Sequence, residues 1–393
     1  MALALALARA LGPDIAIALV DPALGRMAAE PDDPRASALA AGSQRMLAAL
    51  GVWPAIAAEA EPVRRIEITD SSLEAGVRPV LLTYDNALDD GAWASFIVPN
   101  AVLLRELAAA LGQHGTIVPL ATAAVGCAVD GAGASVRLAD GSLIAARLVV
   151  AADGRRSALR EAAGIKVVGW DYPQAGIVTN VAHERPHNGV ATQHFLPAGP
   201  FAILPLPGNR SCITWTEDAE AARTILALDD GAFLAEVDRR FGGRLGGLRL
   251  AGGRRSWPLA MHLARSYTRP RFALIGDAAH GVHPIAGQGL NIALRDVAAL
   301  AECVADAARA GFDPGDTTAL ERYERWRRFD ATLSTATFDA LNRLFSSDIA
   351  LLRSTRELGL GIVDRLPALK RLLVTEAAGL TGELPRLLRG QAA

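Results

Sequence analysis

Residues 274–296, LIGDAAHGVHPIAGQGLNIALRD, combine an apolar strand, a glycine-containing loop and the start of a helix. The strand ends at Gly276 and Asp277, which places a short acidic side chain at the carboxyl end of a sheet strand, where ligands of open α/β sheets bind. In the following loop, Gly287 and Gly289 let the backbone approach a ligand closely. The unpaired N–H groups at the start of the helix favour negative charge. The stretch therefore predicts an α/β fold with a ligand site at this loop.

Size and composition limit the class of protein. The chain has 393 residues, enough for two domains, and its formal net charge of −2 gives no reason to expect a nucleic-acid partner. Cys127, Cys212 and Cys303 are far apart without metal-ligand spacing, so we expect free thiols, no metal and a reducing cytoplasm. No apolar run approaches the roughly 20 residues that cross a bilayer. We therefore expect a cytoplasmic protein, with peripheral contact to the inner membrane as the alternative.

The N-terminal residues 1–22 indicate a helix, a turn and a strand, IAIALV, that leads to Asp21. In a dinucleotide-binding βαβ unit, a carboxylate about 20 residues beyond the glycine-rich loop contacts the ribose. Asp21 suits this role, and counting back places that loop at or before Met1. We expect the natural protein to begin about 15–30 residues earlier with a strand and a Gly-x-Gly-x-x-Gly loop. The chain as given is then expected to express poorly or to purify colourless.

Hydrophobic periodicity predicts the middle elements. Met46, Leu47 and Leu50 fall at helical spacing before Gly51, and NAVLLRELAAALGQHG predicts an amphipathic helix that ends at a glycine. Strand-like runs occupy residues 66–98. Two alternating runs flank an Asp-Gly turn in ASVRLADGSLIAARLVV, which predicts a β-hairpin.

The chain from about residue 170 to 265 has mostly strand-like patterns with one helix near 230–242, and from about 316 it is helical. We expect an α/β, two-domain (α+β) protein: a Rossmann-like domain with an inserted antiparallel β-sheet substrate domain and a helical C-terminus. The expected boundaries are 1–65, 96–168 and 266–315 for the discontinuous first domain, 66–95 and 169–265 for the substrate domain, and 316–393 for the C-terminal helices.

A second motif is VVAADGRRSALREAAGI, in which a strand ends at Asp153 and Gly154 and a helix begins near Ser157. Without further context it predicts a turn followed by a helix N-cap.

Taken in order, these motifs resemble the class A flavin monooxygenases, which have the p-hydroxybenzoate-hydroxylase-like fold. Within that family, GDAAHGVHPIAGQGLNIALRDVAAL is similar to the signature of the ubiquinone-biosynthesis aromatic hydroxylases. VVAADGRRSALREAAGI and RASALAAGSQRMLAALGVW resemble two more family motifs, the latter a helix after the second strand. The resemblance extends from residue 1 to about residue 360 and implies FAD as cofactor and NAD(P)H as reductant.

The resemblance assigns roles to individual residues. It implies that Asp277 hydrogen-bonds the ribityl chain of FAD, that Pro284 lies near the reactive face of the flavin, and that residues 287–291 hold the isoalloxazine edge. Asp153 and Gly154 would lie near the pyrophosphate and the nicotinamide path. The implied cofactor-binding set is Asp21, Arg35, Arg105, Asp153, Gly154, Gly276, Asp277, Gly287, Gln288, Gly289, Leu290 and Asn291.

Some assignments have simple structural alternatives. Arg155 and Arg156 would add positive charge near the Asp-Gly motif, whereas Arg35 and Arg105 are either flavin contacts or ordinary surface arginines. His280 and His283 flank the glycine loop, and loop histidines with satisfied hydrogen bonds are the alternative to proton chemistry there. Their roles stay open at this point.

The resemblance implies an FAD-dependent monooxygenase that uses NAD(P)H and O₂ to hydroxylate the ring of a polyprenylated phenol in ubiquinone biosynthesis. The reduced flavin captures O₂ as a C4a-hydroperoxide, and the electron-rich ring attacks its outer oxygen, while the protein orients the ring and excludes water. One alternative is an FAD hydroxylase or halogenase of a small soluble aromatic, although no Trp-x-Trp-x-x-Ile motif of halogenases is present. Another is a non-catalytic scaffold that assembles other quinone-biosynthesis proteins.

The C-terminal region from about residue 340 combines leucines at helical spacing with Arg343, Arg353, Arg356 and Arg365. Such a helix can lie on an anionic membrane or bind partner proteins, and packing against the FAD domain is the alternative.

Overall fold

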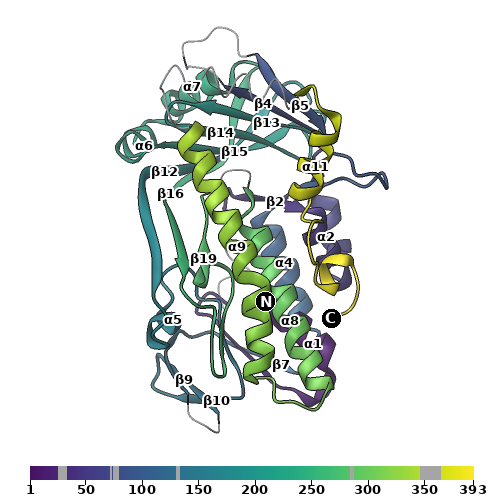
Figure 1. Cartoon of the computed structure of the whole chain (residues 1–393). Coiled ribbons are helices and arrows are strands. Elements are labelled where there is room, and N and C mark those ends of the chain that lie inside the picture. The colour runs from purple at the N-terminus through teal and green to yellow at the C-terminus, as the bar shows by residue number, and fades with distance from the viewer. Residues whose placement is uncertain (25–32, 71–72, 74–78, 130–132, 284–286, 346–363) are drawn as a thin grey trace.

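The structure is a computed structural model that describes residues 1–24, 33–70, 73, 79–129, 133–283, 287–345 and 364–393. A large sheet with helices α6 (Ala219–Leu226) and α7 (Asp230–Phe241) occupies the upper part of Figure 1, and helices with small sheets occupy the lower part. Two long strands, β12 (Val167–His183) and β16 (Leu248–Ala264), extend from the large sheet into the lower part.

Two pairs of parallel strands form the centre of the lower part. β1 (Ile17–Val20) pairs with β7 (Ile117–Leu120), and β11 (Val149–Ala151) pairs with β18 (Phe272–Leu274). Within the described residues, these pairs belong to separate sheets, and β17 (Thr268–Arg269) extends the second one. The expected helix and strand at the N-terminus are both present.

Helices pack against these strands. α1 (Ala2–Leu11) contacts α8 (Gly289–Arg309), and seven consecutive residues of α1, Ala2 to Ala8, are buried. The remaining elements of this region are α2 (Ala41–Ala49), α3 (Trp53–Ile56), α4 (Asn100–Leu111), α5 (Ala158–Ala162), β2 (Ala36–Ala40), β3 (Glu61–Pro62), β6 (Ser95–Pro99), β8 (Ala124–Val129), β9 (Ala134–Leu138) and β10 (Leu143–Ala146). β9 and β10 form the hairpin that the Asp-Gly turn predicted, with Gly141 at φ +86°.

The large sheet has eight strands in the order β19-β16-β12-β15-β14-β13-β4-β5. Its other members are β4 (Arg65–Asp70), β5 (Val80–Asp85), β13 (Val190–Leu196), β14 (Gly199–Leu206), β15 (Arg210–Asp218) and β19 (His280–Gly281). The sheet is antiparallel, as the sequence predicted, except that β4 and β13 are parallel. Arg64 N, just before β4, donates to Gly189 O, just before β13, over 2.9 Å. This hydrogen bond joins the starts of the two strands, so they run in the same direction.

Helices α6 and α7 cover a buried aromatic cluster on this sheet, which includes Phe201, Trp215 and Phe233. The sequence predicted α7 but not α6. Both helices start with an aspartate cap: Asp218 accepts hydrogen bonds from two backbone N–H groups of α6, and Asp229 accepts one from α7.

One motif differs from its expected structure. The stretch that begins at Arg35 resembled a single helix, but Ala36–Ala40 form strand β2, and α2 begins only at Ala41. β2 pairs antiparallel with β6 over five residues, from Ala36 opposite Pro99 to Ala40 opposite Ser95. The inter-strand hydrogen bonds therefore outweigh the helix propensity of this alanine-rich segment.

The C-terminal region is helical where the structure describes it. α9 (Thr317–Phe345) runs diagonally from the lower helices to the large sheet, and α11 (Pro367–Ala377) lies on the opposite side in Figure 1. Arg353 and Arg356, part of the expected basic helix, fall outside the described residues. In the described part of the chain, no helix is both long and apolar enough to cross a bilayer.

Candidate functional site

The carboxyl ends of β11 and β18 bring the two acidic motifs together. The strands are parallel with Ala151 opposite Leu274, so the Asp153–Gly154 and Gly276–Asp277 turns emerge beside each other. Gly154 and Gly276 have φ angles of +82° and +56°, a region that favours glycine. Asp153 Oδ2 accepts a hydrogen bond from Leu159 N over 3.2 Å, and both Asp153 and Asp277 are exposed.

Arg160, which the sequence did not single out, ties these two turns together. Its Nη1 donates to Ala278 O over 2.9 Å and its Nη2 donates to Arg155 O over 3.0 Å, and the residue is 5% exposed. Ser157 Oγ accepts from Arg160 N, which confirms the expected N-cap. No local pattern identifies Arg160, because one of its acceptors lies 118 residues further along the chain.

The N-terminus of α8 is joined to β2 through Asn291. Its Oδ1 accepts from Ala40 N over 2.9 Å and from Ser43 Oγ over 2.8 Å, and its Nδ2 donates to Ala38 O over 2.8 Å. The side chain of Asn291 is therefore engaged in a structural junction. A ligand at this position would meet backbone groups of the α8 N-terminus rather than this amide.

The glycine loop before α8 is shaped for close approach. Gly287 has φ +63°, and a side-chain carbon there would lie 3.3 Å from Ala38 Cβ. Gln288 precedes the helix without a side-chain cap. The N–H groups of the first turn, at Gly289 and Leu290, therefore have no acceptor within α8 and can face an electron-rich group.

Two histidines of this region, His262 and His283, lie in different environments. His262 Nε2 donates to Asp277 O over 2.7 Å, and burial lowers the pKa of His262. Burial lowers the pKa of His283 to about 4, against an opposing effect of Asp339, so its ring is neutral at pH 7. The His283 ring packs edge-on against Tyr172 with centroids 5.2 Å apart, and Tyr172 donates to Asp339 over 2.5 Å.

The remaining predicted residues have local partners. Arg35 forms an ion pair with Asp33 over 2.6 Å and lies over the Trp257 ring. Arg105, on α4, pairs with Glu59 over 2.5 Å and with Glu106 over 2.7 Å. These carboxylates already neutralise both arginines, so any contact with a phosphate would compete with the existing ion pairs.

The last two predicted site residues are Asp21 and Pro284. Asp21 follows β1, and its Oδ1 accepts from Ala23 N over 2.7 Å. Pro284, the one residue expected near the reactive face of the flavin, lies outside the described residues.

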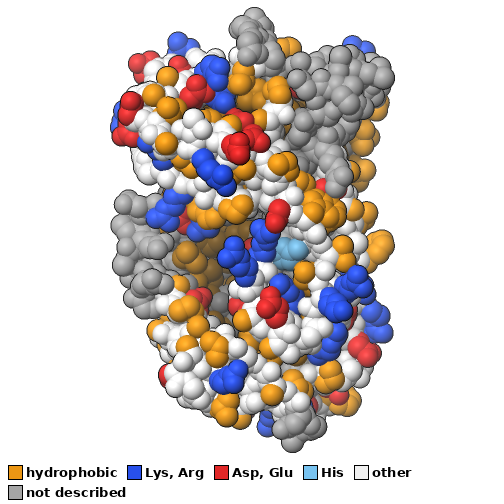
Figure 2. Space-filling model, turned by 90° about the vertical axis from the view of Figure 1, so that its left-hand side faces the viewer, with side chains coloured by type: hydrophobic (Ala, Val, Ile, Leu, Met, Phe, Trp, Pro, Cys, Tyr) orange, Lys and Arg blue, Asp and Glu red, His pale blue; other side chains and the backbone are white. Residues whose placement is uncertain are grey.

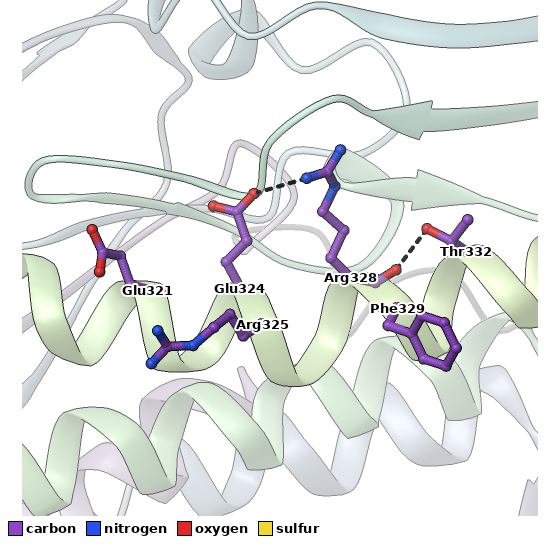
Figure 3. A pocket seen from close by; sticks show the side chains of 6 residues that line it. All are labelled: Glu321, Glu324, Arg325, Arg328, Phe329 and Thr332. Carbon is purple, nitrogen blue, oxygen red and sulfur yellow. Dashed lines mark hydrogen bonds and ion pairs between the residues drawn. The ribbon is translucent and has the colours of Figure 1, made fainter.

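The surface of the molecule is hollowed. Figure 2 shows a hollow in one face of the molecule with hydrophobic side chains in it, and with Lys or Arg side chains and a histidine beside it. A pocket of about 550 Å³ lies along α9 (Figure 3) and is lined by Glu321, Glu324, Arg325, Arg328, Phe329 and Thr332. Four of these six side chains are charged, and none of the predicted site residues is among them. Such a pocket does not provide the dry environment that flavin oxygenation requires.

Residues 276–283 and 287–291 fit the flavin end of FAD. The positive φ of Gly276 and the exposed Asp277 carboxylate suit hydrogen bonds from the hydroxyl groups of a ribityl chain. The absence of a side chain at Gly287 lets the loop lie close to Ala38 of β2, and the α8 N-terminus offers N–H donors and the positive end of the helix dipole to an electron-rich ring edge.

The family match and the named relatives show that the chain is an FAD-dependent monooxygenase. Within that class, the chain belongs to the family described as the FAD binding domain, which matches residues 15–335.

Named relatives support the same family assignment. The chain is 46% identical over 362 residues to ubiquinone hydroxylase UbiL of Rhodospirillum rubrum, with 91% of this chain and 83% of the relative covered. It is 34% identical to the 3-demethoxyubiquinol 3-hydroxylase of Escherichia coli K12, with 88% of each chain covered. Among solved structures, p-nitrophenol 4-monooxygenase PnpA from Pseudomonas putida DLL-E4 superposes with a TM-score of 0.75 at 18% identity, covering 94% of this chain and 98% of the other. This last similarity concerns the fold alone.

Proposed function

We propose that the protein hydroxylates the aromatic ring of a polyprenylated phenol in ubiquinone biosynthesis, with FAD as cofactor, NAD(P)H as reductant and O₂ as oxidant. The observation that supports it most is the packing of the Gly276–Asp277 turn against α8, in a chain 46% identical to a ubiquinone hydroxylase. In the overall reaction, one oxygen atom of O₂ enters a ring C–H bond as a hydroxyl group. The other leaves as water with two electrons and one proton from NAD(P)H and one proton from solvent.

FAD supplies the oxygen-activating chemistry when it is bound, and we assign supporting roles to the chain. Asp277 accepts hydrogen bonds from the ribityl hydroxyls, and the backbone of residues 287–291 holds the isoalloxazine edge. Asp153 and Gly154 lie toward the pyrophosphate and the path of the nicotinamide. Asp21 would bind the ribose, and Arg35 and Arg105 would exchange their present carboxylate partners for cofactor groups.

Gly287 is exposed and residues 288–290 are half-buried, so bound cofactor and substrate must themselves help to keep water from the ring. His283 is 1% exposed and stays neutral, so it places no net charge beside the ring. Excluding water strengthens each fixed dipole around the reacting groups. The apolar side chains in the hollow of Figure 2 are suited to an aromatic ring with a prenyl chain.

Flavin content and coupled turnover test the proposal. With FAD added, the protein is expected to oxidise NAD(P)H faster when a prenylated phenol is present, with hydroxylated product detected by mass spectrometry. A chain that binds no FAD and oxidises no NAD(P)H would favour the scaffold alternative, whereas turnover with small soluble aromatics alone would favour the other hydroxylase alternative. Mass spectrometry of the quinone intermediates that accumulate in a deletion strain would identify the ring position.

We further propose peripheral membrane contact through α11, because the substrate resides in the bilayer. Leu372 and Leu373 are 59% and 41% exposed, Leu366 at the start of the helix is 47% exposed, and Arg365 and Arg371 beside them are exposed. Exposed leucines together with arginines suit the interface of an anionic bilayer. Separately, we propose that the domain boundaries are those expected from the sequence.

Point substitutions test this contact better than deletion of residues 341–393. Leu387 and Leu388 are 2% and 1% exposed in the main core, and Arg386 pairs with Asp306 over 2.8 Å, so such a deletion would destabilise the fold. A double variant of α11, Leu372→Ser with Leu373→Ser, is expected to reduce cosedimentation with phosphatidylglycerol vesicles about fivefold or more. Phe312→Ser, an equally exposed apolar site on another surface, is the control. Equal cosedimentation of the double variant and the control would reject the contact.

A further inference from the structure

A buried carboxylate, Asp296 of α8, lies behind the Gly276–Asp277 turn. Asp296 is 0% exposed, and its Oδ2 accepts hydrogen bonds from Gly276 N over 2.9 Å and from His280 Nε2 over 2.6 Å. Its Oδ1 accepts from Arg327 Nε of α9 over 2.8 Å. One carboxylate therefore holds the turn, the following loop and a distant helix together.

The ionic contacts continue beyond Asp296. Arg327, 3% exposed, also donates to Asp330 over 2.5 Å, and Asp330 accepts from Arg295 over 2.9 Å. Burial raises the pKa of Asp296, but His280 and Arg327, which donate hydrogen bonds to it, bring that pKa below its usual value. Asp296 is therefore ionised in a region that contains two aspartates and two arginines of balanced charge.

Two more residues of α9 form hydrogen bonds with the strands that lead to the turn. Tyr323 OH donates to Leu274 O over 2.7 Å, at the last residue of β18. Glu324 accepts from Tyr267 N over 3.1 Å and from Thr268 Oγ1 over 2.6 Å. Since residues 323, 324 and 327 fall on one side of a helix, a single face of α9 holds both strands and Asp296.

The turn is fixed from both sides. Asp296 holds Gly276 N, and on the far side Arg160 and His262 donate to the carbonyls of Ala278 and Asp277. A side-chain carbon at Gly276 would lie 3.3 Å from Ala293 Cβ, one helical turn before Asp296. Because buried charges cost free energy that apolar residues would not, a structural role alone does not explain an ion cluster here.

We propose that Asp296, braced by Arg327, is a positioning residue for FAD: it fixes the Gly276 turn and thereby the orientation of the Asp277 carboxylate toward the cofactor. This inference rests on the proposed contact between Asp277 and FAD. Asp296 does not touch the cofactor, so its entire effect on FAD affinity passes through Asp277. Non-additivity between the two residues is the signature of that arrangement.

A double-mutant cycle on the full chain tests it, with FAD dissociation constants measured by flavin fluorescence and unfolding measured without FAD. Asp296→Asn keeps the shape and an acceptor for Gly276 N but removes the charge, and it is expected to weaken FAD binding about tenfold. In the Asp277→Ala background, the same substitution is expected to change FAD affinity less than about twofold. Its effect on the unfolding midpoint of the apoprotein is expected to be equal in both backgrounds.

Glu324→Gln is the matched control, because Glu324 lies on the same face of α9 and binds β17 but not the Gly276 turn. It is expected to lower the unfolding midpoint and to leave FAD affinity and the visible circular dichroism of bound flavin unchanged. Should Asp296→Asn not fold, Arg327→Lys replaces it, since a lysine cannot bridge both aspartates. That variant is expected to alter the flavin dichroism and to weaken FAD binding severalfold.

The outcomes separate this inference from the cofactor contact. Wild-type FAD affinity in Asp277→Ala overturns the contact and this inference with it. Loss of affinity in Asp277→Ala, combined with wild-type affinity in Asp296→Asn, overturns the inference alone. Additive losses in the double variant, or an equal loss in Glu324→Gln, would show that Asp296 acts on FAD only through general stability.

Discussion

At the scale of single residues, the site depends on a few groups whose surroundings differ sharply. Asp277 is an exposed carboxylate on a turn that three hydrogen bonds fix, whereas His283, six residues on, is almost wholly buried. An exposed acceptor on a rigid turn can meet a ligand without rearrangement. The buried, neutral imidazole of His283 instead packs in the protein interior, where its nitrogen atoms give it a polar edge.

Asp277→Ala is expected to weaken FAD binding about 10-fold to 150-fold, because a hydrogen bond to a charged group contributes about 1.5–3 kcal/mol. The fold is expected to persist, since the side chain is exposed. Flavin titration of the purified variant, with far-ultraviolet circular dichroism as the check on folding, measures both. A variant saturated with flavin and fully active would remove Asp277 from the site.

His283 predicts a pH dependence of stability. Since burial lowers its pKa from 6.5 to about 4, the unfolded chain binds this proton more readily than the native one between those values. Its contribution is complete above pH 6.5 and is lost as the pH falls toward 4, up to about 3 kcal/mol. The stability difference between wild type and His283→Gln, from urea unfolding at about pH 7.5 and about pH 4.5, is expected to shrink by about 2–3 kcal/mol. A pH-independent difference would contradict the burial argument.

At the scale of elements, the N-terminus of α8 is connected to β2 through the side chain of Asn291. The residues it joins are about 250 positions apart in the sequence, and the amide satisfies two backbone groups, Ala40 N and Ala38 O, at the end of a strand. The loop that would receive the flavin thus keeps its distance from β2 through one side chain. Arg35 lies three residues before Ala38, so this junction also fixes the backbone position from which the Arg35 side chain extends.

Asn291→Ala is expected to destabilise the native state by about 2–4 kcal/mol, because it leaves buried donors and acceptors without partners. Gln288→Ala is the comparison, since Gln288 lies one turn earlier and its Oε1 accepts a 3.3 Å hydrogen bond from Asn291 Nδ2. Urea unfolding gives both free energies. Equal and small losses in the two variants would mean that the junction does not depend on Asn291.

At the scale of the whole molecule, the three cysteines report on packing in different regions. Cys212, in the large sheet, and Cys303, in α8, are 0% and 1% exposed, and burial raises the pKa of each thiol to about 12. Cys127 is half-buried, and burial also raises its pKa. Thiol labelling therefore distinguishes local access from global unfolding.

In the native protein at about pH 8, one thiol per chain is expected to react with Ellman's reagent, because a buried neutral thiol is inert. That thiol is Cys127, so Cys127→Ser is expected to abolish labelling until denaturant is added. In guanidinium chloride, all three thiols of the wild type are expected to react. Rapid labelling of two or three thiols in the native state would contradict the packing described here.

The sequence alone determined the local elements and the order of the motifs. The helix before Gly51, the helix from Asn100, the hairpin at Gly141 and the cap at Ser157 were all predictable, because spacing, turn glycines and capping side chains act over a few residues. The motif at residues 274–296 could be recognised for the same reason. FAD and the monooxygenase class followed from the resemblance of these motifs to a known family.

Only the tertiary structure decided which distant groups meet. Strand β2 forms where an alanine-rich helix was expected because β6 supplies its hydrogen bonds, and β4 joins the large sheet beside a strand more than 100 residues away. Arg160 and Asp296 are ordinary helical residues until carbonyls, N–H groups and charges from other segments surround them. A buried charge is tolerated only where such partners converge, and convergence depends on long-range packing that no local sequence pattern encodes.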